Sequence, residues 1–109
     1  MSIEIGQFRD LTQRVLKGIG LYSPEAEELI VFTVAAESNG AQMEPRTHDD
    51  IWENYLAYRE ELGELVLEVC GMGNGPDVAC LEFNLAYAIA MARIHYRRVP
   101  EALPPQGKG

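Results

Sequence analysis

The chain has 109 residues, of which 47% are hydrophobic, and a formal net charge of −8 at pH 7. This length suits one domain with a modest core. The acidic balance argues against non-specific binding to nucleic acid or to an anionic membrane surface, because both need a basic footprint. No stretch reaches the roughly 20 apolar residues of a membrane span, and the acidic N-terminus is not followed by the apolar run of a signal peptide. We therefore expect a protein made in the cytoplasm without its own export signal.

The first predicted helix covers residues 4–17. Phe8, Leu11 and Val15 repeat at helical spacing, and polar residues occupy the opposite face. Gly18 and the glycine two positions later end the pattern. We interpret this segment as an amphipathic helix that packs on the core.

The second predicted helix is much more apolar. Ser23 is a favourable N-cap, and Pro24 suits the first helical position. Residues 29–36 are apolar on nearly all faces, and Asn39-Gly40 is a typical helix stop. A helix that is apolar all round is surrounded by other helices, so we predict that this one is the centre of the fold.

Glu37 comes at the end of this apolar helix. It shares a helical face with Ile30 and Val34, which predicts partial burial of its carboxylate. The C-terminal end of the helix dipole also opposes a negative charge. Both effects push the pKa of a carboxyl group upward, which is what a general acid needs near neutral pH.

A third helix is predicted to begin at Thr47. Thr47 and Asp50 have the spacing of a capping box, and we interpret His48 as part of the same charged first turn. Trp52 and Tyr55 fall on the apolar stripe of this helix. We interpret them as core residues, with a stacking platform for sugar rings as the alternative.

Two further helices are predicted after residue 59. Residues 60–70 form the first, bent or broken near Gly63, and a glycine-rich loop follows. The second runs from about Pro76 to Arg98, with arginines near its C-terminal end, where the dipole favours them. A binding site for an acidic partner is the alternative interpretation of these arginines. Residues 1–98 then make up a single domain, and residues 99–109 are a proline-rich extended tail.

Cysteine and histidine usage suggests no metal site. His48 and His95 lie far apart, and neither is spaced with a cysteine as metal ligands are. Cys70 and Cys80 flank the glycine-rich loop. We favour two free thiols over a disulfide, although this spacing permits either.

Two short motifs follow one another after the apolar helix, Glu37-Ser38-Asn39-Gly40 and Gln42-Met43-Glu44-Pro45-Arg46-Thr47. Together they resemble the lytic transglycosylase and goose-type lysozyme group. With His48-Asp49-Asp50-Ile51-Trp52 behind them, they look most like small lysozyme-like proteins of bacteriophages. The later segment Asn84-Leu85-Ala86-Tyr87-Ala88 is similar to the family helix that carries an Asn and a Tyr along the glycan cleft. The resemblance covers roughly residues 24–98.

This resemblance implies an all-α, lysozyme-like domain of about five helices that acts on the glycan strands of peptidoglycan. Glu37 would be the acid and base for cleaving the β-1,4 bond between N-acetylmuramic acid and N-acetylglucosamine, with no cofactor or metal. The residues implied to bind the glycan are Ser38, Gln42, Met43, Asn84 and Tyr87.

The chain departs from the family at one place. The family has a longer segment between its Glu and its Gln-Met, which carries a small β-lobe, whereas Glu37 and Gln42 are only five positions apart here. We therefore expect the β-lobe to be absent or vestigial. Three alternatives remain: a bacteriophage lytic enzyme, a virion or tail-associated protein that keeps the helices with little or no activity and binds other virion proteins, and a generic acidic helical adaptor.

Overall fold

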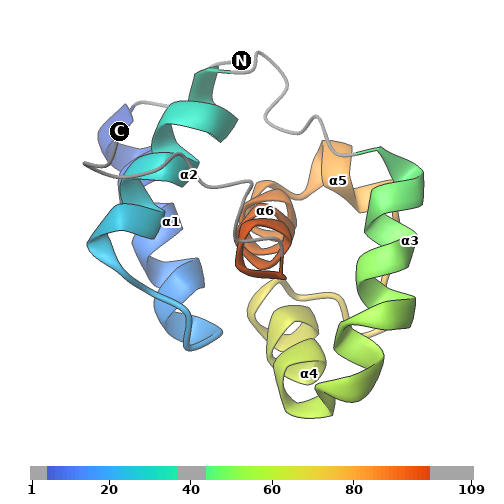
Figure 1. Cartoon of the computed structure of the whole chain (residues 1–109). Coiled ribbons are helices and arrows are strands. Elements are labelled where there is room, and N and C mark those ends of the chain that lie inside the picture. The colour runs from blue at the N-terminus through green and yellow to red at the C-terminus, as the bar shows by residue number, and fades with distance from the viewer. Residues whose placement is uncertain (1–4, 37–43, 99–109) are drawn as a thin grey trace, which may run out of the picture.

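The computed structural model describes residues 5–36 and 44–98 (Figure 1). Five α-helices have 10 to 14 residues each: α1 (Ile5–Gly18), α2 (Pro24–Ala36), α3 (Pro45–Asn54), α4 (Glu60–Val69) and α6 (Leu85–Arg98). A 3-10 turn, η1 (Leu56–Tyr58), and a single helical turn, α5 (Cys80–Phe83), complete the described ranges, which contain no strand. The predicted all-α class is confirmed, with five helices of substantial length.

The last helix, α6, lies at the centre of the fold. Figure 1 shows it nearly end-on, with α1 and α2 on one side, α3 and α5 on the other, and α4 below. It contacts all five other α-helices. Tyr87, Ile89, Met91 and Ile94 on this helix are completely buried. The buried alanines of α6, Ala88 and Ala90, have small side chains that let neighbouring helices approach closely.

The prediction that α2 is the central helix is therefore wrong. This helix packs on α1 and α6 through buried residues such as Ile30 and Val31, and Phe32 on its outer side is 69% exposed. The composition of α2 is apolar on several faces, so its sequence does not indicate which face is covered. The start of α2 agrees with the prediction, because Ser23 Oγ accepts a hydrogen bond from the Ala26 N–H at 3.1 Å.

The third helix begins two residues earlier than predicted. Pro45 is its first residue and Glu44 is its N-cap, without a side-chain capping bond. Proline fixes a helical φ and has no N–H to leave unsatisfied, so it outweighs the capping box predicted at Thr47. Thr47 consequently lies inside the first turn of α3.

The fourth helix, α4, is unbroken at Gly63, contrary to the predicted bend. A Cβ atom at this position would lie 3.2 Å from Cζ3 of Trp52, which is tighter than an ordinary van der Waals contact. Gly63 is buried and makes room for the indole ring. The glycine therefore serves the packing of α3 against α4.

The predicted single helix from Pro76 to Arg98 is also wrong, because the chain leaves the helical conformation at Asn84. This residue ends α5 with an extended backbone (φ −118°, ψ 99°). Its side-chain oxygen accepts a hydrogen bond from the Tyr87 N–H at 3.1 Å, so Asn84 is the N-cap of α6.

Candidate functional site

Four of the six residues predicted for the glycan site, Glu37, Ser38, Gln42 and Met43, lie outside the described residues. The helices on both sides of them are described. The α2 helix ends at Ala36, immediately before Glu37, and α3 begins at Pro45, two residues after Met43. The other two residues, Asn84 and Tyr87, are described.

Tyr87 is completely buried, and its hydroxyl group contacts two side chains of α3. The hydroxyl oxygen accepts a hydrogen bond from Nε1 of Trp52 at 2.9 Å and lies 2.6 Å from Nε2 of His48. Because an indole nitrogen can only donate, the hydroxyl hydrogen is available for His48 Nε2. Burial raises the pKa of Tyr87 to about 12, against the lowering effect of the Trp52 hydrogen bond. The phenol is therefore neutral at physiological pH.

This arrangement also assigns the tautomer of neutral His48. With Nε2 accepting from Tyr87, the ring proton resides on Nδ1, which lies 3.0 Å from Oδ1 of the exposed Asp49. His48 lies in the first turn of α3, as predicted, but its side chain is only 3% exposed. Its ring is a buried polar link between α3 and α6. Trp52 packs against the core, as predicted.

Asn84 uses both polar atoms of its side chain within the protein. Besides capping α6, it donates from Nδ2 to the backbone oxygen of Cys70 at 2.8 Å. The amide therefore fixes the start of α6 against the end of α4. The capping bond from the Tyr87 N–H to the Asn84 side chain brings these two residues together. Their role in binding glycan stays a prediction.

Both cysteines are free thiols, which agrees with the favoured interpretation. Cys70 is buried at the end of α4, and Cys80 is partly exposed at the start of α5. Burial raises the pKa of the Cys70 thiol to about 11. A thiol with such a pKa is a poor nucleophile at neutral pH, because the thiolate is the reactive form.

A buried acid that the sequence analysis missed lies at the other end of α2. Glu27 is 5% exposed, and its carboxylate accepts hydrogen bonds from Arg9 Nη1 at 2.6 Å, Tyr22 Oη at 2.7 Å and Gln13 Nε2 at 3.1 Å. Burial acts to raise the pKa of Glu27, but the hydrogen bonds from Tyr22, Arg9 and Gln13 outweigh it and lower the pKa. This direction is the opposite of what a general acid needs. The cluster is an ionised link between α1 and α2.

The signal for this burial was present in the sequence. Glu27 precedes Ile30 by three positions and Val31 by four, and both of these residues are buried. Residues three and four apart share a helical face. The donors Arg9 and Gln13, four positions apart on α1, have the matching spacing.

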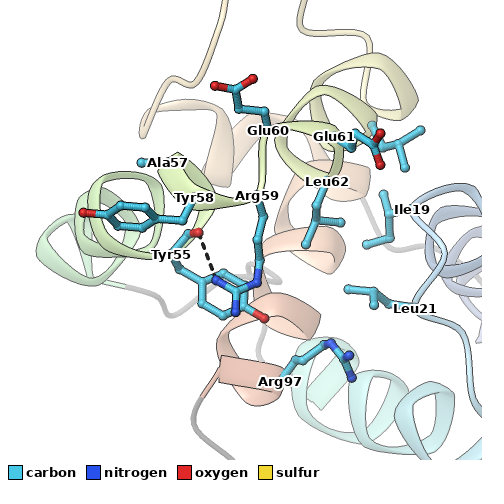
Figure 2. A pocket seen from close by; sticks show the side chains of 11 residues that line it. Ile19, Leu21, Tyr55, Ala57, Tyr58, Arg59, Glu60, Glu61, Leu62 and Arg97 are labelled. Carbon is cyan, nitrogen blue, oxygen red and sulfur yellow. Dashed lines mark hydrogen bonds between the residues drawn. The ribbon is translucent and has the colours of Figure 1, made fainter.

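An open cavity of about 1170 Å³ is lined by neither Asn84 nor Tyr87. Figure 2 shows it between the connection from α1 to α2, the η1 turn, the beginning of α4 and the end of α6. Its lining includes Tyr55, Arg59 and Arg97. The sequence had indicated Tyr55 as a core residue, with a sugar platform as the alternative, and Arg97 as one of the arginines at the end of the last helix; Arg59 had not been singled out.

Comparison with protein-family models, with curated proteins and with solved structures gives no significant match for this chain. None of the helices in the described ranges is long and apolar enough to cross a membrane. Functional inference therefore depends on the motifs and contacts of the chain itself.

Proposed function

We propose that this chain is a small lysozyme-like protein of bacteriophage type that cleaves the glycan strands of peptidoglycan, with Glu37 as its acid and base. The observation that supports the proposal most is the position of the two motifs on the helices. The α2 helix runs up to Ala36, so Glu37-Ser38 follow a helix directly, as in the lytic transglycosylase group. The second motif runs into α3 at Pro45.

A second observation supports the same proposal. The residues that follow the second motif contact the later segment that carries the other resemblance. His48 and Trp52 both hydrogen-bond to Tyr87, which is 39 and 35 positions away in the sequence. The two segments were identified separately, and they pack together as parts of one fold.

The proposed reaction needs a single carboxyl group. Protonated Glu37 donates its proton to the glycosidic oxygen as the bond from that oxygen to the anomeric carbon of N-acetylmuramic acid breaks. A hydroxyl of the same sugar then attacks the anomeric carbon, and the Glu37 carboxylate takes the hydroxyl proton. The product is an anhydro sugar, and no water is consumed. Retaining and inverting glycosidases usually need a second carboxylate, for which the exposed Glu44 is the nearby candidate.

One observation favours the alternative, a virion protein that keeps the helices without the activity. The polar atoms of Asn84 and the hydroxyl of Tyr87 form hydrogen bonds within the protein. The short distance in sequence from Glu37 to Gln42 also removes the segment that carries one wall of the family's cleft. A fold can persist after the chemistry of its site is lost.

Digestion of purified peptidoglycan sacculi tests the proposal directly. Wild-type protein is expected to release anhydro-muropeptides, detected by mass spectrometry, and Glu37→Gln to lower the rate by about 100-fold or more, because a general acid contributes at least that much. Glu44→Gln is the matched control. It should keep the activity, because the proposed reaction uses Glu37 alone, and it should keep the fold, because the Glu44 side chain forms no capping bond. If the wild-type protein releases nothing from sacculi that a control lysozyme does digest, the proposed enzymatic activity is rejected. Equal losses in both variants, with hydrolysed products, would instead indicate a two-carboxylate glycosidase.

A further inference from the structure

The open cavity has an apolar wall, part of which is accessible from solvent, although Ile19 in it is buried. Ile19 and Leu21 contribute to it from the connection between α1 and α2, and Leu62 and Leu65 from α4 (Figure 2). Tyr58 at its edge is 78% exposed, and Leu65 is 37% exposed. Apart from Phe32, these are the exposed large hydrophobic side chains of the described residues. Exposed apolar side chains that gather at one cavity mark an interaction site more often than scattered ones do.

The same cavity holds two guanidinium groups. Arg59 lies over the ring of Tyr55, 3.9 Å from its centroid, and its Nη1 donates to the Tyr55 backbone oxygen at 3.3 Å. These contacts hold Arg59 in place before any ligand binds. Figure 2 shows Arg97 from α6 on the same side of the cavity, whereas Glu60 and Glu61 lie on the opposite side.

A third arginine strengthens the positive field at this end. Arg93 donates from Nε to the backbone oxygen of Leu21 at 2.8 Å. Burial lowers the pKa of Arg93, and the nearby charge of Arg97 lowers it further. Arg97 has no carboxylate ion-pair partner within the part of the chain that the structure describes. An anion bound here would relieve the repulsion between these like charges.

We propose that this cavity is a docking groove for a short acidic segment of a partner protein. The segment places apolar side chains on the apolar wall and a carboxylate on Arg97 and Arg59. The volume and the apolar wall exceed what a lone carboxylate or phosphate would fill. Guanidinium groups bind carboxylates through paired, charge-assisted hydrogen bonds. Nucleic acid fits poorly, because the chain carries a net charge of −8 and two glutamates line the opposite side.

This groove is formed without Asn84 or Tyr87, the two described residues of the proposed glycan site. It is formed by the connection from α1 to α2, η1, the first part of α4 and the end of α6. Loss of peptidoglycan cleavage would therefore leave the docking proposal unaffected, and the reverse also holds.

A yeast-displayed library of random twelve-residue peptides provides the probe. Selection on the full-length protein is expected to enrich sequences that combine Asp or Glu with Leu, Ile or Phe. The affinity of the best synthetic peptide is then measured by fluorescence anisotropy. Arg97→Ala should weaken binding by about tenfold or more, as expected for loss of a hydrogen bond to a charged group. Arg97 is exposed, so its replacement should leave the fold intact. Leu65→Ser tests the apolar wall and should also weaken binding.

The matched control is Arg46→Ala, which removes an exposed arginine from the first turn of α3, outside the groove. Failure to enrich any sequence, enrichment of basic peptides, or equal effects of the Arg97 and Arg46 variants would overturn the proposal. Peptide binding that requires deletion of residues 99–109 would identify the chain's own tail as the occupant. Self-association that Arg97→Ala abolishes would identify a second copy of the chain. Either result would replace the partner segment proposed here.

Discussion

The hydroxyl of Tyr87 on α6 lies 2.6 Å from Nε2 of His48 on α3, in a place that solvent does not reach. Trp52, one turn further along α3, donates to the same hydroxyl. One oxygen atom therefore pairs with the ring nitrogens of two α3 side chains and sets the position of α3 on the central helix. The second motif runs into α3 at Pro45, so this bond also sets where the last residues of the motif, from Pro45 to Thr47, lie relative to α6.

Tyr87→Phe is expected to destabilise the protein by about 1–3 kcal/mol, because it leaves the ring nitrogens of His48 and Trp52 without their buried partner. The measurement is the free energy of unfolding in urea. Tyr58→Phe serves as the control, since Tyr58 is 78% exposed and its hydroxyl should contribute little. A loss below about 0.5 kcal/mol for Tyr87→Phe, within the range of ordinary surface substitutions, would contradict the importance of this bond.

Acid should weaken the link between α1 and α2. The pKa of Glu27 in the folded protein is below its ordinary value of 4.5, so its carboxylate stabilises the fold above that pH. This contribution is lost as the pH falls through the lower, folded-state pKa. Unfolding free energies measured from pH 6 down to pH 3 should show the loss, and Glu27→Gln should reduce the slope. Glu53→Gln, at an exposed position on α3, should leave the slope nearly unchanged.

Alkali should destabilise the protein through buried groups that must stay neutral. Burial raises the pKa of Cys70 from 9.0 to about 11 and that of Tyr87 from 10.0 to about 12. Each group is deprotonated more readily in the unfolded chain, so its contribution is complete below the unfolded-state pKa and disappears as the pH rises through the folded-state value. For Cys70 this window runs from about pH 9 to about pH 11. Unfolding measured at pH 8, 10 and 11 should show a smaller loss in Cys70→Ala than in Cys80→Ala, and equal losses would argue against the buried thiol.

Much of the fold was readable from the sequence, because helix ends have local chemical signals. Ser23 caps α2 as predicted, and the five principal helices fall close to the apolar repeats. The errors at Pro45 and Asn84 have one cause. At each position, a residue that starts a helix was read as part of a loop or of a longer helix. Competing signals within a few residues cannot be ranked without the packing that selects one of them.

The choice of the central helix depended on tertiary packing, which local pattern does not determine. Apolar content pointed to α2, yet α6 is enclosed, and Phe32 of α2 faces outward. Burial of an acid is observed in α2 at Glu27, where three donors satisfy the carboxylate. For Glu37, which lies outside the described residues, it stays a prediction.

Gly63→Ala tests the close packing of α3 and α4. Alanine favours a helix over glycine by about 1 kcal/mol, but its Cβ would approach Cζ3 of Trp52 to 3.2 Å. The indole is held by its bond to Tyr87 and cannot move away freely. We expect the overpacking to outweigh the gain in helix propensity, so the midpoint of thermal unfolding should fall. The fluorescence emission of Trp52, the single tryptophan of the chain, should also shift. Gly73→Ala, where a Cβ would meet no atom within 4 Å, should change neither measurement. A stabilised Gly63→Ala with unchanged emission would contradict this packing.

Binding to peptidoglycan should survive the loss of catalysis. If Glu37 acts only in proton transfer, Glu37→Gln removes stabilisation of the transition state and leaves ground-state contacts to the glycan intact. The variant should therefore co-sediment with purified sacculi as strongly as the wild type, although it releases no anhydro-muropeptides. Arg97→Ala is the control for contacts outside the proposed glycan site and should also leave co-sedimentation unchanged, because Arg97 lines the separate groove. If Glu37→Gln abolishes co-sedimentation while its thermal midpoint stays at the wild-type value, Glu37 contributes to glycan binding itself. If neither wild type nor variant sediments with sacculi, the glycan is not the ligand, and the virion alternative is favoured.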